Sequence, residues 1–369
     1  MGFDEFMALA LYSPGLGYYS GPARKFGVHG DFVTAPEISP MFGACLAQQI
    51  AAWMEAAEIS HLVEFGAGTG QLATQVLNEL GRLGITPSRY SIVELSGNLR
   101  AQQQSTLEAL CPQSLHLVDW LDHIPAKLQA VVFANELLDA MPVRLFAWDG
   151  EQLFERGVCF DEQKQSFAWE NRLASNEFKK VVQESLMTAG IESLADLPVP
   201  YISEIHEQGQ AWIRTVSEQL DTGCILTLDY GFPAREYFHS QRDRGTLACH
   251  YQHRVGFDPF IHLGEQDITA HVDFTSIHRS AAASGMKLAG FCAQARFLMN
   301  TGILDRLSQQ PMDQTVAYAS QAHAVGKLLS EAEMGELFKA IAWVKGSDAA
   351  TQDRLLNASF AFDPGGRSL

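Results

Sequence analysis

Acidic residues and glycines are combined in one short stretch of this chain. An apolar run over 61–65 contains Glu64, and Gly66, Gly68 and Gly70 follow it. The run predicts a strand, and the glycines predict a tight turn into a helix, because a residue without Cβ lets the backbone turn sharply and approach a ligand. This order is typical of a nucleotide-like ligand bound at the carboxyl end of the first strand of an α/β sheet. A glycine-rich turn without a ligand is the alternative interpretation.

The spacing of the glycines distinguishes between ligands. A dinucleotide site has the pattern G-x-G-x-x-G, and its third glycine would fall where Gln71 stands. The chain has G-x-G-x-G instead, which is typical of S-adenosylmethionine (SAM) methyltransferases. SAM has no pyrophosphate, so the loop would surround a sulfonium amino acid and a ribose. We therefore predict SAM as the cofactor, and an NAD-dependent oxidoreductase is the disfavoured alternative.

Polar residues also end the next three predicted strands. Glu94 ends a strand over 89–94 and is placed to accept hydrogen bonds from both ribose hydroxyls. A strand over 115–118 leads to Asp119 and Trp120, which we expect to bind the adenine amino group and to cover the ring. A strand over 130–134 leads to Asn135, which could orient a substrate amide or the methionine part of SAM. Since parallel strands end at one sheet edge, these residues are expected to line one site.

The residues after the fourth predicted strand are placed to act on the group that receives the methyl. An enzyme that methylates a nitrogen must orient that nitrogen and remove a proton as the N–C bond forms. Carboxylates can do both. Glu136 and Asp139 are therefore the first candidates, and a helix N-cap is the alternative for Asp139. His271 is a candidate second proton acceptor, and Asp273 is a candidate N-cap.

The first 38 residues are rich in Gly and Tyr and predict a lid over the site. Tyr18 and Tyr19 would cover the ligand and line the acceptor channel. Three residues before the next helix are expected to contact SAM from above: Thr34, Pro36 and Glu37. A well-packed N-terminal arm is the alternative interpretation.

Composition and charge narrow the class of protein. The chain has 369 residues, of which 47% are hydrophobic, enough for a sizeable core. No apolar run approaches the length of about 18 residues expected of a membrane span, and the N-terminus resembles neither a secretory signal nor a transit peptide. The 6 cysteines are scattered and contain no C-x-x-C pair, which predicts reduced thiols and a cytoplasmic protein. His250 and His253 do not form a recognisable metal site with a nearby Cys or Glu, so no metal is expected.

The net charge of −17 disfavours a nucleic-acid partner, whose phosphates would be repelled, and favours a basic substrate.

The expected fold class is α/β, a Rossmann-like seven-stranded SAM-dependent methyltransferase fold with helical and loop insertions. The expected organisation is an N-terminal lid over 1–38, a SAM-binding core over 39–150 and a mainly helical insertion over 151–220. The rest of the sheet would occupy 221–345, with a substrate-side insertion over 232–270, and the tail over 346–369 would be disordered. Within the core, helices are expected over 39–57, 71–82 and 97–110.

Several blocks together resemble the MidA-like family of SAM-dependent methyltransferases, whose mitochondrial members are complex I assembly factors and protein arginine methyltransferases. The blocks are 12–19, 30–39, 64–70, 135–142, 229–231 and 269–274. The resemblance implies a protein arginine methyltransferase with a protein partner, a respiratory complex I-type subunit being one candidate. Without a mitochondrial presequence the chain is similar to the bacterial branch, and it begins later than family members usually do. A small-molecule methyltransferase and a non-catalytic SAM-binding assembly chaperone stay open as alternatives, and the oligomeric state, with a dimer among the options, stays open too.

Overall fold

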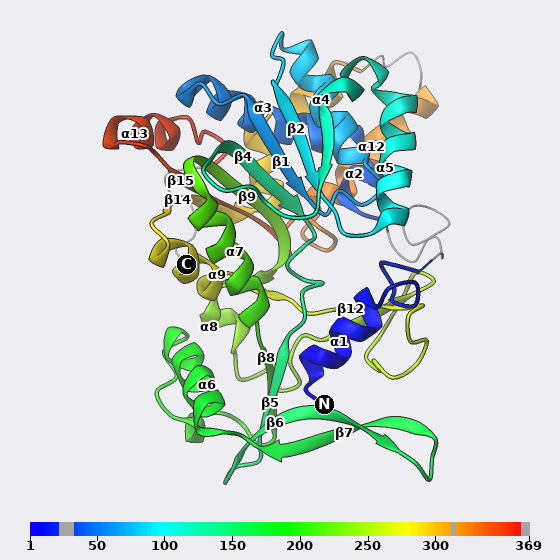
Figure 1. The fold of residues 1–369 in the computed structure, drawn as a ribbon, viewed down its shortest axis with the longest axis vertical. Helices are drawn as coiled ribbons and strands as arrows, with labels where there is room; N and C mark the ends of the chain where they lie inside the picture. The colour runs from blue at the N-terminus through cyan, green and yellow to red at the C-terminus, as the bar shows by residue number, and fades with distance from the viewer. Residues whose placement is uncertain (22–32, 311–314, 363–369) are drawn as a thin grey trace.

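The computed structural model describes residues 1–21, 33–310 and 315–362. Its centre is a sheet of seven strands in the order β14-β15-β9-β4-β1-β2-β3, to which the short β13 (Val272–Asp273) adds beside β9. The five strands from β9 to β3 run parallel, and β15 is antiparallel to both of its neighbours. This arrangement confirms the predicted seven-stranded α/β fold (Figure 1). The bounds are β1 (His61–Phe65), β2 (Arg89–Val93), β3 (Val118–Leu121), β4 (Leu128–Asn135), β9 (Leu220–Phe232), β14 (Lys287–Ala293) and β15 (Phe338–Lys345).

Helices cover both faces of this sheet, as the buried, almost continuously apolar strands require. Successive residues of a strand point to opposite faces, so Leu62 packs in one hydrophobic cluster and Val63 in the other. The second cluster is closed by α7 (Glu207–Gln219) and α9 (Phe274–Ala283). The first is closed by α3 (Pro40–Ala57), α4 (Gln71–Arg82), α5 (Gly97–Leu110), α10 (Gln294–Asn300), α11 (Ile303–Ser308), α12 (Thr315–Leu329) and α13 (Ala349–Asn357).

The first three of these helices lie within a residue of their predicted bounds. Ser39 is the N-cap of α3 and its hydroxyl accepts from the Met41 backbone N–H, with Pro40 at the first helical position. The prediction of a disordered tail is wrong for α13, which packs on α3. There the Trp53 indole donates to the Ser359 hydroxyl at 3.0 Å, and Leu355 is buried. Residues 363–369 lie outside the described part of the chain.

A second, antiparallel sheet extends the molecule beyond the central one (Figure 1). Its order is β7-β6-β5-β8, with β5 (Arg144–Trp148), β6 (Leu153–Asp161), β7 (Ser166–Leu173) and β8 (Tyr201–Ile205). The prediction of a mainly helical 151–220 is therefore wrong in part. β7 is an edge strand with little burial on either face, so its sequence lacks the clear alternation of apolar and polar residues that identifies a strand. α7, also in this range, belongs to the central sheet.

Helices lie on both faces of the second sheet as well. Leu145 packs against α1 (Phe3–Tyr12), while its neighbour Phe146 packs against α6 (Asn176–Thr188) and α8 (Ala234–Tyr237). A third sheet, β11-β10-β12, lies beside α1 and comprises β10 (Ala248–Tyr251), β11 (Arg254–Gly256) and β12 (Asp267–Thr269). The remaining short elements are α2 (Ala35–Ile38) and two 3₁₀ helices, η1 (Pro112–Leu117) and η2 (Leu194–Asp196). Residues 22–32 of the predicted lid are outside the described part, and in the described ranges no helix has the length and apolarity needed to cross a membrane.

Candidate active site

A cavity of about 920 Å³ lies at the carboxyl ends of β1, β2 and β4. The glycine-rich turn between β1 and α4 forms its base. Gly66 and Gly68 line the cavity with left-handed backbones, at φ 63° and 52°, which favour glycine. Gly70 has φ 84° but does not line the cavity. A Cβ at Gly70 would lie 3.1 Å from the Cα of Gln103, so this glycine serves the close packing of α4 on α5 rather than ligand contact.

Glu64 lies beneath this turn and is 1% exposed. The Tyr90 hydroxyl donates to its Oε2 at 2.5 Å. Burial raises the pKa of Glu64 to about 7, although that hydrogen bond lowers it. The side chain lines the cavity, so a bound cation or hydrogen-bond donor would stabilise its charged form.

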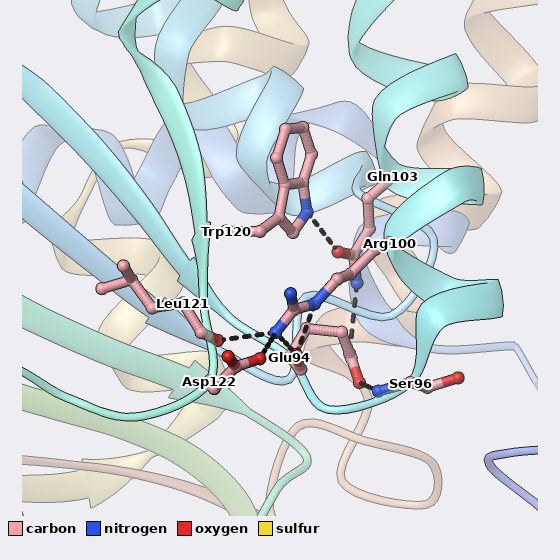
Figure 2. Close-up of polar contacts among 7 residues, drawn as sticks. All are labelled: Glu94, Ser96, Arg100, Gln103, Trp120, Leu121 and Asp122. Carbon is pink, nitrogen blue, oxygen red and sulfur yellow. Dashed lines mark hydrogen bonds and ion pairs between the residues drawn. The ribbon is translucent and has the colours of Figure 1, made fainter.

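Glu94 lies at the end of β2, where its carboxylate is held by α5 (Figure 2). Oε1 accepts from the Ser96 backbone N–H at 2.8 Å, and Oε2 accepts from the Gln103 amide at 3.2 Å. A carboxylate has about four lone-pair sites, so two remain for a ligand with two adjacent hydroxyls. This geometry fits the ribose contact predicted for Glu94.

Arg100 joins the ends of β2 and β3 beside that carboxylate (Figure 2). Its guanidinium donates to the backbone carbonyls of Glu94 and Leu121 and to Oδ1 of Asp122. Asp122 and His123 line the cavity beyond β3. Sequence reasoning missed both of them, because it placed the third strand three residues too early.

The prediction for Asp119 and Trp120 is wrong, because both lie within β3 rather than after it. η1 occupies the residues that were expected to form the strand, and Pro112 at its start was a sequence signal for such a turn. Asp119 accepts from the Arg89 guanidinium at 2.6 and 2.9 Å, away from the cavity. Trp120 donates to the Gln103 side chain at 2.9 Å, so it acts on Glu94 only through that amide (Figure 2).

The loop after β4 brings two carboxyl groups into the cavity. Glu136 and Asp139 both line it, and Asp139 is 5% exposed. Glu136 adopts φ 51°, and its Oε1 accepts from the Asn135 amide at 3.0 Å and from the Ala35 backbone N–H at 3.4 Å. Asp139 Oδ2 accepts from the Tyr230 hydroxyl at 2.5 Å. No helix begins at Asp139, since the next element is β5, so the alternative that it is an N-cap is wrong.

Asp229 holds this loop in place. Its Oδ2 accepts from the backbone N–H groups of Leu137, Leu138 and Asp139 at 3.1, 2.8 and 3.3 Å. Three consecutive N–H groups on one carboxylate oxygen fix the direction in which the loop presents its side chains. These contacts give Asp229 a structural role.

The pKa values of the two cavity carboxyls are raised. Burial, and after it the charge of Asp139, raises the pKa of Glu136 to about 8. Burial raises the pKa of Asp139 to about 6, against the effect of the Tyr230 hydrogen bond. Oδ1 of Asp139 and Oδ1 of Asn135 are buried without a hydrogen-bond partner. Unpaired buried acceptors cost stability, and a ligand that is rich in N–H donors would satisfy them.

The charges along the cavity have one sign. None of the described residues that line it is a Lys or an Arg. The acidic side chains of the lining are Glu37, Glu64, Glu94, Asp122, Glu136 and Asp139. Carboxylates in a concave site raise the local concentration of cations, so the cavity suits positively charged ligands. Both a sulfonium and a guanidinium meet that condition.

Comparisons with known proteins agree with this site. Residues 45–292 match a family described as "putative S-adenosyl-L-methionine-dependent methyltransferase". The crystal structure of a COG1565 superfamily member from Burkholderia thailandensis, bound to S-adenosyl-homocysteine, has 43% sequence identity and a TM-score of 0.91 over 100% of this chain and 92% of that one. This chain belongs to that methyltransferase family. The resemblance to MidA-like proteins is confirmed, and SAM is the cofactor.

Curated relatives carry a more specific name. The protein arginine methyltransferase NDUFAF7 of Danio rerio is 28% identical over 366 residues, which cover 91% of this chain and 81% of that protein. The NDUFAF7 homolog of Caenorhabditis elegans, also named a protein arginine methyltransferase, is 26% identical over 82% of this chain and 73% of its own length.

The N-terminal arm of the methyltransferase contributes a wall of the cavity. Thr34, Pro36 and Glu37 line it, and the Thr69 hydroxyl donates to Glu37 at 2.6 Å. Tyr19 also lines it, as predicted. Tyr18 does not: it is fully buried in the hydrophobic cluster around α1, so the prediction that it binds substrate is wrong. Tyr12, which sequence reasoning missed, lines the cavity instead.

His271 does not reach the cavity of the methyltransferase, against the prediction of a proton acceptor. Its ring packs edge-on against Tyr230, with the centroids 5.2 Å apart, and Tyr230 in turn contacts Asp139. Burial lowers the pKa of His271 to about 4. Asp273 is the N-cap of α9, as predicted. Within the described ranges, no group of three or more His, Cys, Asp or Glu side chains is arranged to hold a metal ion.

Proposed function

We propose that this methyltransferase acts on arginine side chains of a protein. The observation that carries the proposal is the pair Glu136 and Asp139, a half-buried and a buried carboxyl in a cavity whose described lining has no Lys or Arg. The names of the curated relatives support it. A planar guanidinium with five N–H donors matches a cluster of acceptors, two of which lack partners.

In the proposed reaction, Glu136 and Asp139 bind the guanidinium and localise its charge on the nitrogens away from the reacting one. SAM supplies the methyl group from its sulfonium, which leaves as a thioether. As the N–C bond forms, the reacting nitrogen loses a proton, and the carboxylate of Asp139 or Glu136 accepts it. Carboxyls with pKa values of about 6 and about 8 lie close to neutral pH, which is the range in which a general base is most effective. The Tyr230 hydroxyl holds Asp139 in position.

The partner that we propose is a protein with an accessible basic segment, consistent with a net charge of −17. A respiratory complex I-type subunit is the candidate that the MidA-like resemblance implies. We also propose that the chain acts in the cytoplasm of a bacterium. A small-molecule acceptor remains the second candidate, because the cavity alone does not require a polypeptide.

The test is chemical identification of the methylated atom. The protein is incubated with methyl-labelled SAM and an array of arginine-containing and lysine-containing peptides, and each product is hydrolysed and analysed by mass spectrometry. We expect methylarginine and no methyllysine. Label found only on a small molecule, or on a residue other than arginine, would contradict the proposal.

The control is Gly68→Arg, whose long side chain would enter the cofactor cavity from a turn with φ 52°. This variant is expected to lose the label entirely while it keeps its fold, as judged by circular dichroism. Label retained by the variant would identify a contaminating methyltransferase.

A further inference from the structure

Tyr12 and Tyr19 form an aromatic wall of the cavity, on the side of the N-terminal arm. Their rings are stacked, with centroids 5.5 Å apart and an interplanar angle of 21°. Tyr18 packs edge-on against Tyr19 at 5.1 Å. Tyr19 therefore lies between two other rings, whereas one face of Tyr12 has no such neighbour among these three.

Both hydroxyls are engaged in hydrogen bonds within the protein. Tyr12 donates to the backbone carbonyl of Ala140 at 2.8 Å, and Tyr19 donates to the Asp267 carboxylate at 3.0 Å. Ala140 directly follows Asp139, so the first of these bonds ties the arm to the loop that bears the cavity carboxylates. Tyr12 nevertheless keeps 42% of its surface exposed. Since its hydroxyl is engaged, the surface that it presents to the cavity is mainly that of its ring.

Tyr12 also lies within electrostatic range of both ends of the cavity. Desolvation of its hydroxyl, and then the charges of Asp267, Asp139 and Glu94, raise its pKa, so it stays an uncharged phenol. We call the part of the cavity around Glu94 the cofactor end, and the part around Glu136 and Asp139 the acceptor end. The ring therefore lines the same cavity as the carboxyls of both ends.

We propose that the Tyr12 ring is the platform on which the substrate guanidinium stacks, with Tyr19 as its rigid backing, and that this platform selects arginine over lysine. The inference rests on the proposed arginine substrate. A guanidinium is planar and weakly hydrated, so it can stack on a ring and still present its N–H edge to Glu136 and Asp139. A lysine ammonium is compact and strongly hydrated and gains less from a flat surface.

The test measures binding rather than turnover. N-acetyl-L-arginine amide and N-acetyl-L-lysine amide are titrated into the full chain saturated with S-adenosylhomocysteine. We expect the wild type to prefer the arginine amide. Tyr12→Leu should weaken arginine binding about tenfold, which corresponds to about 1.4 kcal/mol, and should remove the preference. Tyr12→Phe, which keeps the ring, should retain the preference even if the lost anchor weakens binding of both amides.

The matched control is Tyr251→Leu, at a tyrosine that stacks on His262 outside the cavity. It should change neither affinity. Affinity for S-adenosylhomocysteine serves as the check of folding, and Tyr12→Met replaces Tyr12→Leu if the latter does not fold. An arginine preference that survives the loss of the ring would overturn the platform and leave the proposed function standing. A wild type without any arginine preference, together with no methylarginine in the peptide array, would overturn both.

Discussion

The two ends of the cavity hold their carboxylates in different ways. At the cofactor end, Glu94 receives donors on both oxygens, from Ser96 and Gln103, before any ligand binds. At the acceptor end, the Glu136 contacts fall on Oε1, and Oδ1 of Asp139 is buried without a partner. The cofactor end is thus organised in advance, while the acceptor end is left short of donors. On the proposed assignment, a bound acceptor would supply the hydrogen-bond donors that this end lacks.

The largest expected effect comes from neutralising the acceptor end. Glu136→Gln and Asp139→Asn should each lower kcat about 10²- to 10⁴-fold, the usual loss when a proton acceptor is removed. Affinity for S-adenosylhomocysteine, measured by calorimetry, should change little. Glu151→Gln, in the turn between β5 and β6, is the matched control. A small effect on kcat with a large effect on cofactor affinity would reverse the assignment of the two ends.

A smaller effect is expected at the cofactor end. Glu94→Gln keeps the shape of the side chain but loses its charge, so S-adenosylhomocysteine should bind about 10- to 100-fold more weakly, as expected for hydrogen bonds to a charged group. Asp119→Asn tests where the structure places Asp119. The sequence predicted that this residue binds the cofactor, whereas the structure pairs it with Arg89. This variant should leave the affinity nearly unchanged. Equal losses in both variants would contradict the position of β3.

The pH dependence of the reaction follows from the acceptor end. A carboxyl accepts a proton only when it is ionised, so kcat/KM should rise with pH between about 5 and 8. Below pH 6 it should fall about tenfold per pH unit, because Asp139, with a pKa of about 6, becomes protonated. In Asp139→Asn the rise should follow the pKa of Glu136, which should lie below its value of about 8 in the wild type because the charge of Asp139 no longer raises it. A flat profile over this range would argue against a carboxylate base.

The smallest expected effect is on stability. The pKa of Glu136 is about 8 in the folded protein, above its value in the unfolded chain of about 4.3. The folded state therefore binds more protons between these values, and its stability falls as pH rises through that window. Glu136→Gln removes this cost, so it should raise the melting temperature by a few degrees at pH 8 and much less at pH 5. An increase that is the same at both pH values would contradict the raised pKa.

Much of the fold and part of the site could be predicted from the sequence. The glycine turn, the acid at the end of β2 and the helices α3, α4 and α5 depend on local signals: glycine spacing, a Ser-Pro helix start and apolar periodicity. The roles of Glu136, Asp139 and Glu94 remain predictions, although the structure places all three at the cavity. The errors at Asp119, Tyr18 and β7 share a cause, since strand boundaries and the directions of side chains depend on packing.

Local signals along the chain were enough to predict an α/β sheet with glycines and acids at one edge, because these residues stand at or just after the ends of predicted strands. Which of the tyrosines of the N-terminal arm face the cavity depends on how the arm packs in the folded protein. Tyr12, Tyr18 and Tyr19 lie on one arm, and the choice depends on contacts with Ala140 and Asp267, which are far away in the chain. The fold also supplies the physical reason for a structural role of Asp229, because its three N–H donors come from the loop after a neighbouring strand.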